Sequence, residues 1–147
     1  SQVSSLQSLA RLNVDSRDGF RYATEQLGDK AAYLKELFLK AADQREQASQ
    51  DLNEFVQEQD EEEVQEGSYL ASLHRSILGL RNLLSSEADP YAILAEAERG
   101  EDAILHAYED ALTEDFGAEI NAKLREQYVI VKATHDQVRT LRDAAAD

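Results

Sequence analysis

Apolar residues recur every three or four positions along most of the chain, which is the spacing of one buried helix face. The first segment, for example, carries Leu6, Leu9, Phe20 and Leu27 on one face. The periodicity predicts five helices, at residues 3–27, 30–57, 68–84, 90–112 and 118–144. Because no segment of useful length alternates with period two, we expect an all-helical fold.

Helix breakers are scarce and fall between these segments. Gly28 and Asp29 separate the first two helices, and Asp29 is a candidate N-cap because its carboxylate can accept from free amides of the next helix. Pro90 stands at a first helical position, where its missing amide costs nothing. Residues 58–67 are almost all acidic or amide residues. Such a block is typical of a solvated linker or a frayed helix end; a cation or partner site is the second interpretation.

The spacing of the helices predicts how they pack. Two pairs of long helices each have a tight turn, so each pair is expected to form an antiparallel hairpin. A connection of roughly 30 residues, with a short helix of its own, separates the pairs. Short loops within pairs and one long crossover are typical of a ferritin-like four-helix bundle. We therefore expect a single domain over residues 1–147, with the short crossover helix covering one side or end of the bundle.

Each long apolar stripe is interrupted near its centre by a polar residue. Glu101 interrupts the helix at 90–112, Arg45 that at 30–57, and His135 the last helix, while Asn13 and Arg17 interrupt the first. Counting outward from the two turns places these residues at similar heights. The sequence therefore predicts one shared polar layer across the bundle.

Ionised groups in a dry interior are costly unless they are paired, so this layer has two interpretations. In the first, Arg45, Glu101 and His135, with Asn13 or Arg17, satisfy one another, and no cofactor is expected. In the second, iron, manganese or zinc is bound by Glu98, Glu101 and His135.

The template for a metal centre in such bundles is a Glu from each of two helices and a Glu-x-x-His from each of the others. The chain contains no Glu-x-x-His. A guanidinium such as that of Arg45 stays protonated and cannot be a ligand. This favours the internal network, with no catalytic residues and a degenerate metal site.

Composition narrows the function classes further. Among 147 residues, Asp plus Glu number 30 and Lys plus Arg 15, giving a net charge of −15 without Cys. This charge argues against nucleic acid as a partner, because binding to phosphates depends on Lys and Arg. No stretch approaches the roughly 20 apolar residues that span a bilayer. We expect a cytoplasmic protein without disulfides, and self-association is the partner interaction that a long bundle favours.

The two remaining histidines are expected to have structural roles. His106 lies off the apolar stripe of its helix, four residues after Asp102, and is expected to be exposed and locally paired. His74 lies at the margin of the crossover helix, where it can contact either the bundle or solvent.

Several short motifs occur together along nearly the whole chain: Asp15 with Gly19-Phe20, Gln44-Arg45, His74-Arg75, Glu98-Arg99-Gly100-Glu101-Asp102, Tyr128, Lys132, His135 and Leu141-Arg142-Asp143. With these motifs the sequence resembles the uncharacterised bacterial ferritin-like bundles grouped as domain-of-unknown-function family 2383. It implies a four-helix bundle with an added helix, no established activity, and a shared pattern at Arg45, Glu101 and His135.

Asp15 fits this picture poorly, because an ideal helix would turn it away from the core. We expect either a bend between Asp15 and Gly19 or an Asp15 that acts on the outside.

The functional expectation is therefore a bundle that acts through association, with a role in stress physiology by analogy with the wider ferritin-like group. The alternative is a divergent metal-dependent oxidoreductase or a metal-storage protein.

Overall fold

The structure, a computed structural model, describes residues 2–27, 31–59 and 90–146. These residues form four α-helices: α1 (Gln2–Leu27), α2 (Ala32–Glu58), α4 (Pro90–Ala111) and α5 (Ala118–Ala145). No strand occurs in these three ranges, so the all-helical prediction is confirmed for them. The predicted helix at 68–84, His74 and all but the first two residues of the predicted linker at 58–67 lie outside the described ranges.

The predicted helix bounds hold to within two residues, with a correction at each end of α2. This helix begins at Ala32, and its N-cap is Ala31, which has a positive φ of 48° and makes no side-chain capping hydrogen bond. Asp29 is therefore not the cap, because α2 begins three residues after it. At the other corrected position, α2 continues through Glu58, the first residue assigned to the linker.

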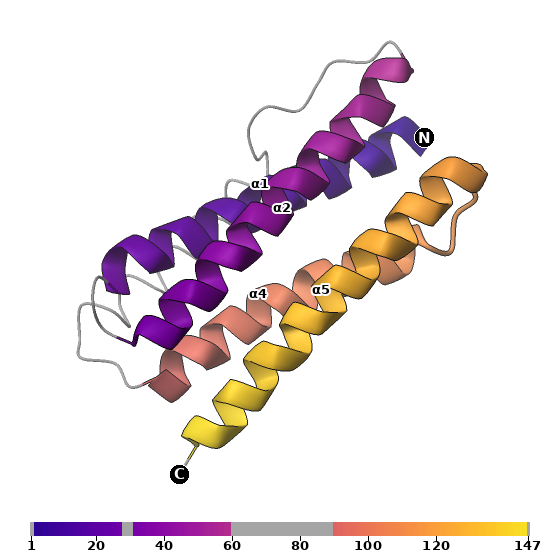
Figure 1. The fold of residues 1–147 in the computed structure, drawn as a ribbon. Coiled ribbons are helices and arrows are strands. Elements are labelled where there is room, and N and C mark those ends of the chain that lie inside the picture. The colour runs from indigo at the N-terminus through magenta and orange to yellow at the C-terminus, as the bar shows by residue number, and fades with distance from the viewer. Residues whose placement is uncertain (1, 28–30, 60–89, 147) are drawn as a thin grey trace.

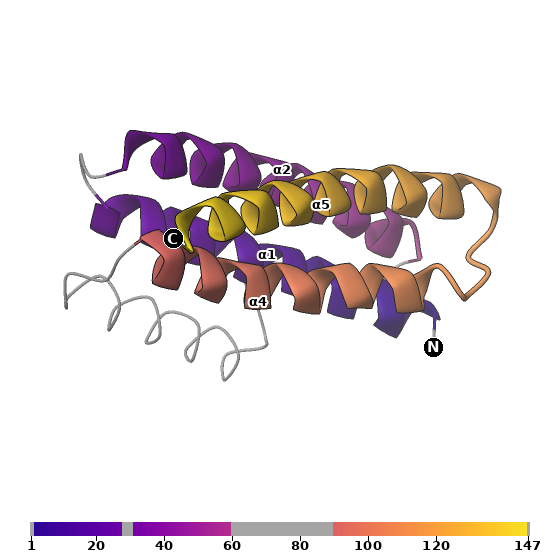
Figure 2. The same ribbon diagram turned by 90° about the horizontal axis from the view of Figure 1, so that it is seen from below.

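The four helices form two antiparallel hairpins that lie side by side (Figure 1). One hairpin consists of α1 and α2, and the other of α4 and α5. The second view shows α1 next to α4 and α2 next to α5 (Figure 2). Helices α2 and α4 both begin at the end of the bundle where the C-terminus lies and both run toward the other end (Figure 1). These two helices are therefore parallel. No helix within the described ranges is long and apolar enough to cross a membrane.

The turn between α4 and α5 fixes the geometry of the second hairpin. Gly117 has a φ of 95°, a conformation that glycine adopts without steric cost. The Asn121 carboxamide oxygen accepts a hydrogen bond from the Phe116 amide at 3.0 Å, and the Asp115 carboxylate accepts one from the Gly117 amide at 3.0 Å. A turn leaves backbone amides without helical partners, and here a carboxamide oxygen and a carboxylate oxygen accept hydrogen bonds from two of them. These hydrogen bonds keep α4 and α5 in one alignment.

Two apolar clusters form the core, one toward each end of the helices. The first is built around residues such as Leu9, Leu52, Tyr108 and Leu124. The second is built around residues such as Phe20, Phe38, Leu94 and Val138. Most of the buried polar residues fall between the two clusters along the sequence: Asn13, Asp15, Arg45, Ser49, Glu98, Glu101, Thr134 and His135. The other three, Thr24, Asn53 and Gln127, lie within the clusters. The interior is therefore apolar at both ends and polar in the middle.

Of the two alternatives expected for Asp15, the structure contradicts the one in which Asp15 acts on the outside. Helix α1 runs without interruption from Gln2 to Leu27, and Asp15 is only 7% exposed. The reason is that α1 is covered on two sides, by α2 and by α4. Asp15 lies on the second of these sides, where it lines a pocket together with Gly100 and Glu101 of α4.

Candidate functional site

The centre of the polar layer is an ion pair that joins the two hairpins. Nη2 of Arg45, on α2, donates to Oε2 of Glu101, on α4, at 2.5 Å, and both side chains are 1% exposed. The guanidinium carbon also lies 5.8 Å from the centre of the Phe20 ring, a distance at which a cation is attracted to the ring face. Burial raises the pKa of Glu101, and the positive charge of Arg45 only partly offsets this effect.

A chain of neutral hydrogen bonds lies beside the ion pair. Nδ2 of Asn13 donates to the Tyr108 hydroxyl at 2.8 Å, and this hydroxyl donates to Oε1 of Gln127 at 2.8 Å. Three helices, α1, α4 and α5, are thereby joined through one phenol that is fully buried. Burial also raises the pKa of Tyr108, so the hydroxyl keeps its proton and remains a donor.

Replacing Tyr108 with phenylalanine should therefore lower the free energy of unfolding by about 1–3 kcal/mol, because buried groups of Asn13 and Gln127 lose a partner. Tyr128→Phe is the matched control, since the Tyr128 hydroxyl makes an exposed contact of 3.3 Å to Glu109. Urea denaturation of both variants measures the difference. Equal loss in the two variants would show that the buried chain does not contribute to stability.

His135 forms the α5 side of the polar layer and is surrounded by acidic groups. Its Nε2 lies 2.6 Å from Oδ1 of Asp102, and its Nδ1 lies 3.1 Å from Oδ1 of Asp136. The hydrogen bond from the imidazole, with help from Lys132, lowers the pKa of Asp136. A neutral imidazole donates from only one nitrogen. The other carboxylate then needs another partner, and Asp136 has one in Lys132, whose Nζ lies 3.0 Å from Oδ1.

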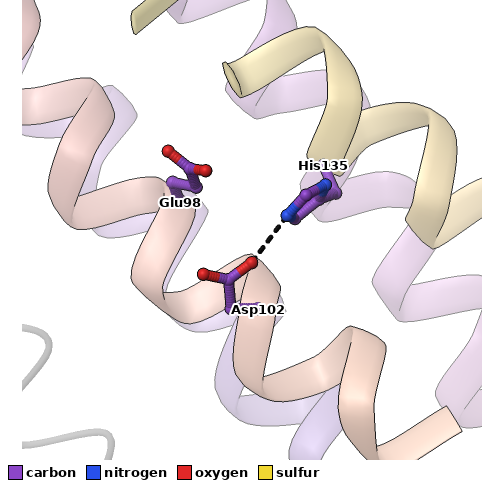
Figure 3. A group of neighbouring side chains, drawn as sticks. All are labelled: Glu98, Asp102 and His135. Atoms are coloured by element: carbon purple, nitrogen blue, oxygen red, sulfur yellow. Dashed lines mark hydrogen bonds and ion pairs between the residues drawn. The ribbon is translucent and has the colours of Figure 1, made fainter. Parts of the chain in front are cut away.

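Glu98 lies one turn before Asp102 on the same face of α4 and completes an acidic group around His135 (Figure 3). One possible ligand atom each from Glu98, Asp102 and His135 lies within 4.8 Å of the others. The Glu98 carboxylate is buried and is also bound by two arginines of α5, Arg139 at 3.4 Å and Arg142.

The structure thus brings together two of the three predicted metal ligands, Glu98 and His135. Glu101, the third, is held by Arg45 instead. Asp102 is the residue that the sequence reasoning missed, because it lies off the apolar stripe and its side chain is 47% exposed. Its position four residues after Glu98 was the available signal, since side chains at that spacing share a helix face.

Two other predicted residues lie away from this group. Arg17, predicted for the buried layer, is only partly buried and pairs with Glu46 at 2.6 Å and Asp18 at 2.8 Å. The hydrogen bond from Arg17 lowers the pKa of Glu46. His106 is 74% exposed, as expected, and its nearest acidic group is that of Glu109 at 3.9 Å rather than that of Asp102.

Fold and site together define an all-helical protein of paired helical hairpins with a polar, charged centre. The family model of a domain of unknown function, DUF2383, matches residues 1–114. The chain belongs to this family. The matched residues include α1, α2 and α4 and end before α5, which carries His135. No curated protein matches the chain.

Proposed function

We propose that this protein is a ferritin-like bundle without a di-metal centre that functions by associating with a second copy of itself. The parallel course of α2 and α4 supports the ferritin-like assignment, because one long crossover connects parallel helices in that group. A groove between α2 and α5 whose described lining contains no acidic residue supports self-association. The two lines of support are independent of each other.

The donor set in the polar layer does not fit a di-metal centre. The template needs four carboxylates and two histidines. Among the described residues, the buried side chains with an acidic or imidazole group are Asp15, Glu98, Glu101 and His135, and Arg45 is paired with Glu101. A guanidinium that stays protonated repels a dication and already neutralises Glu101. We therefore assign no reaction step to such a centre, and the iron or manganese oxidoreductase is the weaker proposal.

The groove between α2 and α5 carries the association proposal. It has a volume of about 180 Å³. None of the described residues that line it is acidic, although the whole chain has a net charge of −15: Leu37, Lys40, Ala41, Gln44, Val129, Ile130, Ala133, Thr134 and Gln137. Val129 is 64% exposed and Ile130 is 37% exposed. An acidic chain can approach its own copy most easily at a groove whose lining is free of carboxylates.

The whole side of the bundle formed by α2 and α5, which contains the groove and also carries Asp51 and Glu126, is large enough for a second copy. Two adjoining helices, each about 40 Å long and about 10 Å wide, present a face on the order of 800 Å², the area that each partner contributes to a stable interface. Two-fold pairing places the same patch on both copies. Burial of Val129 and Ile130 from both copies then supplies the apolar centre of the interface.

Val129→Glu tests the proposal. We expect the unmodified chain to sediment as a dimer at micromolar concentration, and the variant to dissociate at least about tenfold more readily because a carboxylate would lose its hydration in the apolar centre of the interface. Leu39→Glu is the matched control. Like Val129, Leu39 is an exposed apolar residue, with 44% of its surface exposed, but it lies on α2 and does not line the groove.

Sedimentation velocity over a concentration series measures both variants, with circular dichroism to check that each is folded. A monomeric unmodified chain at high concentration, or equal dissociation of the two variants, would contradict the proposal.

A further inference from the structure

We infer that Glu98, Asp102 and His135 form a site for a single divalent transition-metal ion at the boundary between α4 and α5. This site does not depend on the association proposed above. It also differs from a di-metal centre in the bundle interior, because its ligands come from two neighbouring helices and Glu101 is not one of them.

The chemistry of the three side chains defines the ion. One imidazole nitrogen and two carboxylate oxygens suit zinc, manganese or iron(II), whereas magnesium prefers oxygen ligands alone. The two carboxylates balance the two charges of the ion. Zinc ligands lie about 2.0–2.2 Å from the metal, so neighbouring ligand atoms in a tetrahedral site are about 3.4 Å apart. The present ligand atoms lie within 4.8 Å of one another, which side-chain rotation can close.

The accessibility of the three ligands differs in a way that suits an ion entering from solvent. His135 and Glu98 are buried, with side chains 3% and 7% exposed, and are held in place by their helices. The Asp102 side chain is 47% exposed and can rotate toward an arriving ion. Figure 3 shows Asp102 and His135 pointing toward one another, with Glu98 on the adjacent turn.

Two arginines compete with the ion for Glu98. Arg139 and Arg142 both contact its carboxylate, and their side chains are 52% and 29% exposed. Both can therefore swing into solvent when an ion binds. A metal ion takes over the neutralisation of Glu98 that the guanidinium groups provide in its absence. Replacing a ligand should therefore lower the affinity for the metal ion, whereas replacing one of the arginines should raise it.

The site is tested by titrating zinc into the full chain after a chelator has removed any bound metal. Isothermal titration calorimetry measures the binding. We expect one zinc ion per chain, and an affinity at least about tenfold lower in Asp102→Asn, since loss of even an outer partner costs that much. Glu98→Gln is a second ligand variant with the same expectation. Arg142→Gln should bind zinc up to about fivefold more tightly, because the partly exposed Arg142 no longer competes for the Glu98 carboxylate.

His106→Gln is the matched control, because His106 is exposed and lies outside the group. Its affinity for zinc should equal that of the unmodified chain, and magnesium should not displace the zinc. Absence of zinc binding by the unmodified chain, equal affinity in Asp102→Asn, or an equal loss in His106→Gln would each overturn the assignment. Circular dichroism of the metal-free variants shows that they are folded before the titration.

Discussion

Replacing Arg45 with methionine should lower the free energy of unfolding by about 3–5 kcal/mol at neutral pH. The variant leaves the Glu101 carboxylate buried without the guanidinium that lies 2.5 Å away. Methionine fills much of the volume of the arginine stem, so the loss comes from the unpaired charge and not from a cavity. Urea denaturation at pH 7 measures the change.

The pH dependence of this variant distinguishes the charge effect from a packing effect. Burial raises the pKa of Glu101, and removal of Arg45 raises it further above the unfolded value of about 4.3. The folded state then binds more protons than the unfolded state between these two pKa values, so stability falls as the pH rises through this window. Relative to the unmodified chain, Arg45→Met should regain stability as the pH falls toward 4.

Arg21→Met is the control for removal of a positive charge, because the Arg21 side chain is 48% exposed and lies 3.8 Å from Glu46. We expect a change of at most about 1 kcal/mol for it. A melting curve of Arg45→Met that coincides with that of Arg21→Met would mean that Arg45 does not neutralise a buried carboxylate.

Replacing Glu101 with leucine should cost a similar amount, about 3–5 kcal/mol, for the converse reason. Arg45 is then buried without an anion, and a guanidinium cannot lose its proton at any relevant pH. Acidification therefore does not restore the stability of this variant, in contrast to Arg45→Met. Thermal or urea unfolding at pH 7 and pH 5 separates the two cases.

The double variant Arg45→Met with Glu101→Leu should recover most of the loss seen in each single variant. Replacement of a buried ion pair by apolar residues is often neutral, because the desolvation cost of both ions disappears. Nε and Nη1 of Arg45 make no hydrogen bond to groups in the described part of the chain, which increases that cost in the unmodified protein. Additive losses in the double variant would show that the two residues act separately.

The sequence predicted the helices well because the burial of one face fixes the phase of each helix. The bounds of α4 and α5 differ from those predicted by one residue at most. The same phase identified Arg45, Glu101 and His135, since a polar residue in the middle of an apolar stripe stands out. The charge of Arg45 favoured a pairing with a buried carboxylate, and Glu101 is the carboxylate that it contacts.

The sequence could not predict which residues meet across helices. Asp102 approaches His135 because of the rotation of α4 against α5, and the periodicity of one helix contains no information on this rotation. Asp15 was misplaced for a related reason: the periodicity indicated one buried side of α1, whereas α4 covers a second side. Arg17 lies at the edge of the apolar stripe of α1, and the hydrogen bond that it donates to the Glu46 carboxylate determines where its side chain lies.

The position of the Arg45–Glu101 pair between two apolar clusters sets the register in which the hairpins dock. Sliding one hairpin along the other by a single turn would move the two groups apart by about 5.4 Å. The guanidinium of Arg45 would then face side chains such as Ala97 or Leu105. Both charged groups would lie in an apolar environment without a partner. Apolar contacts alone would tolerate several such alignments, whereas the central ion pair admits one.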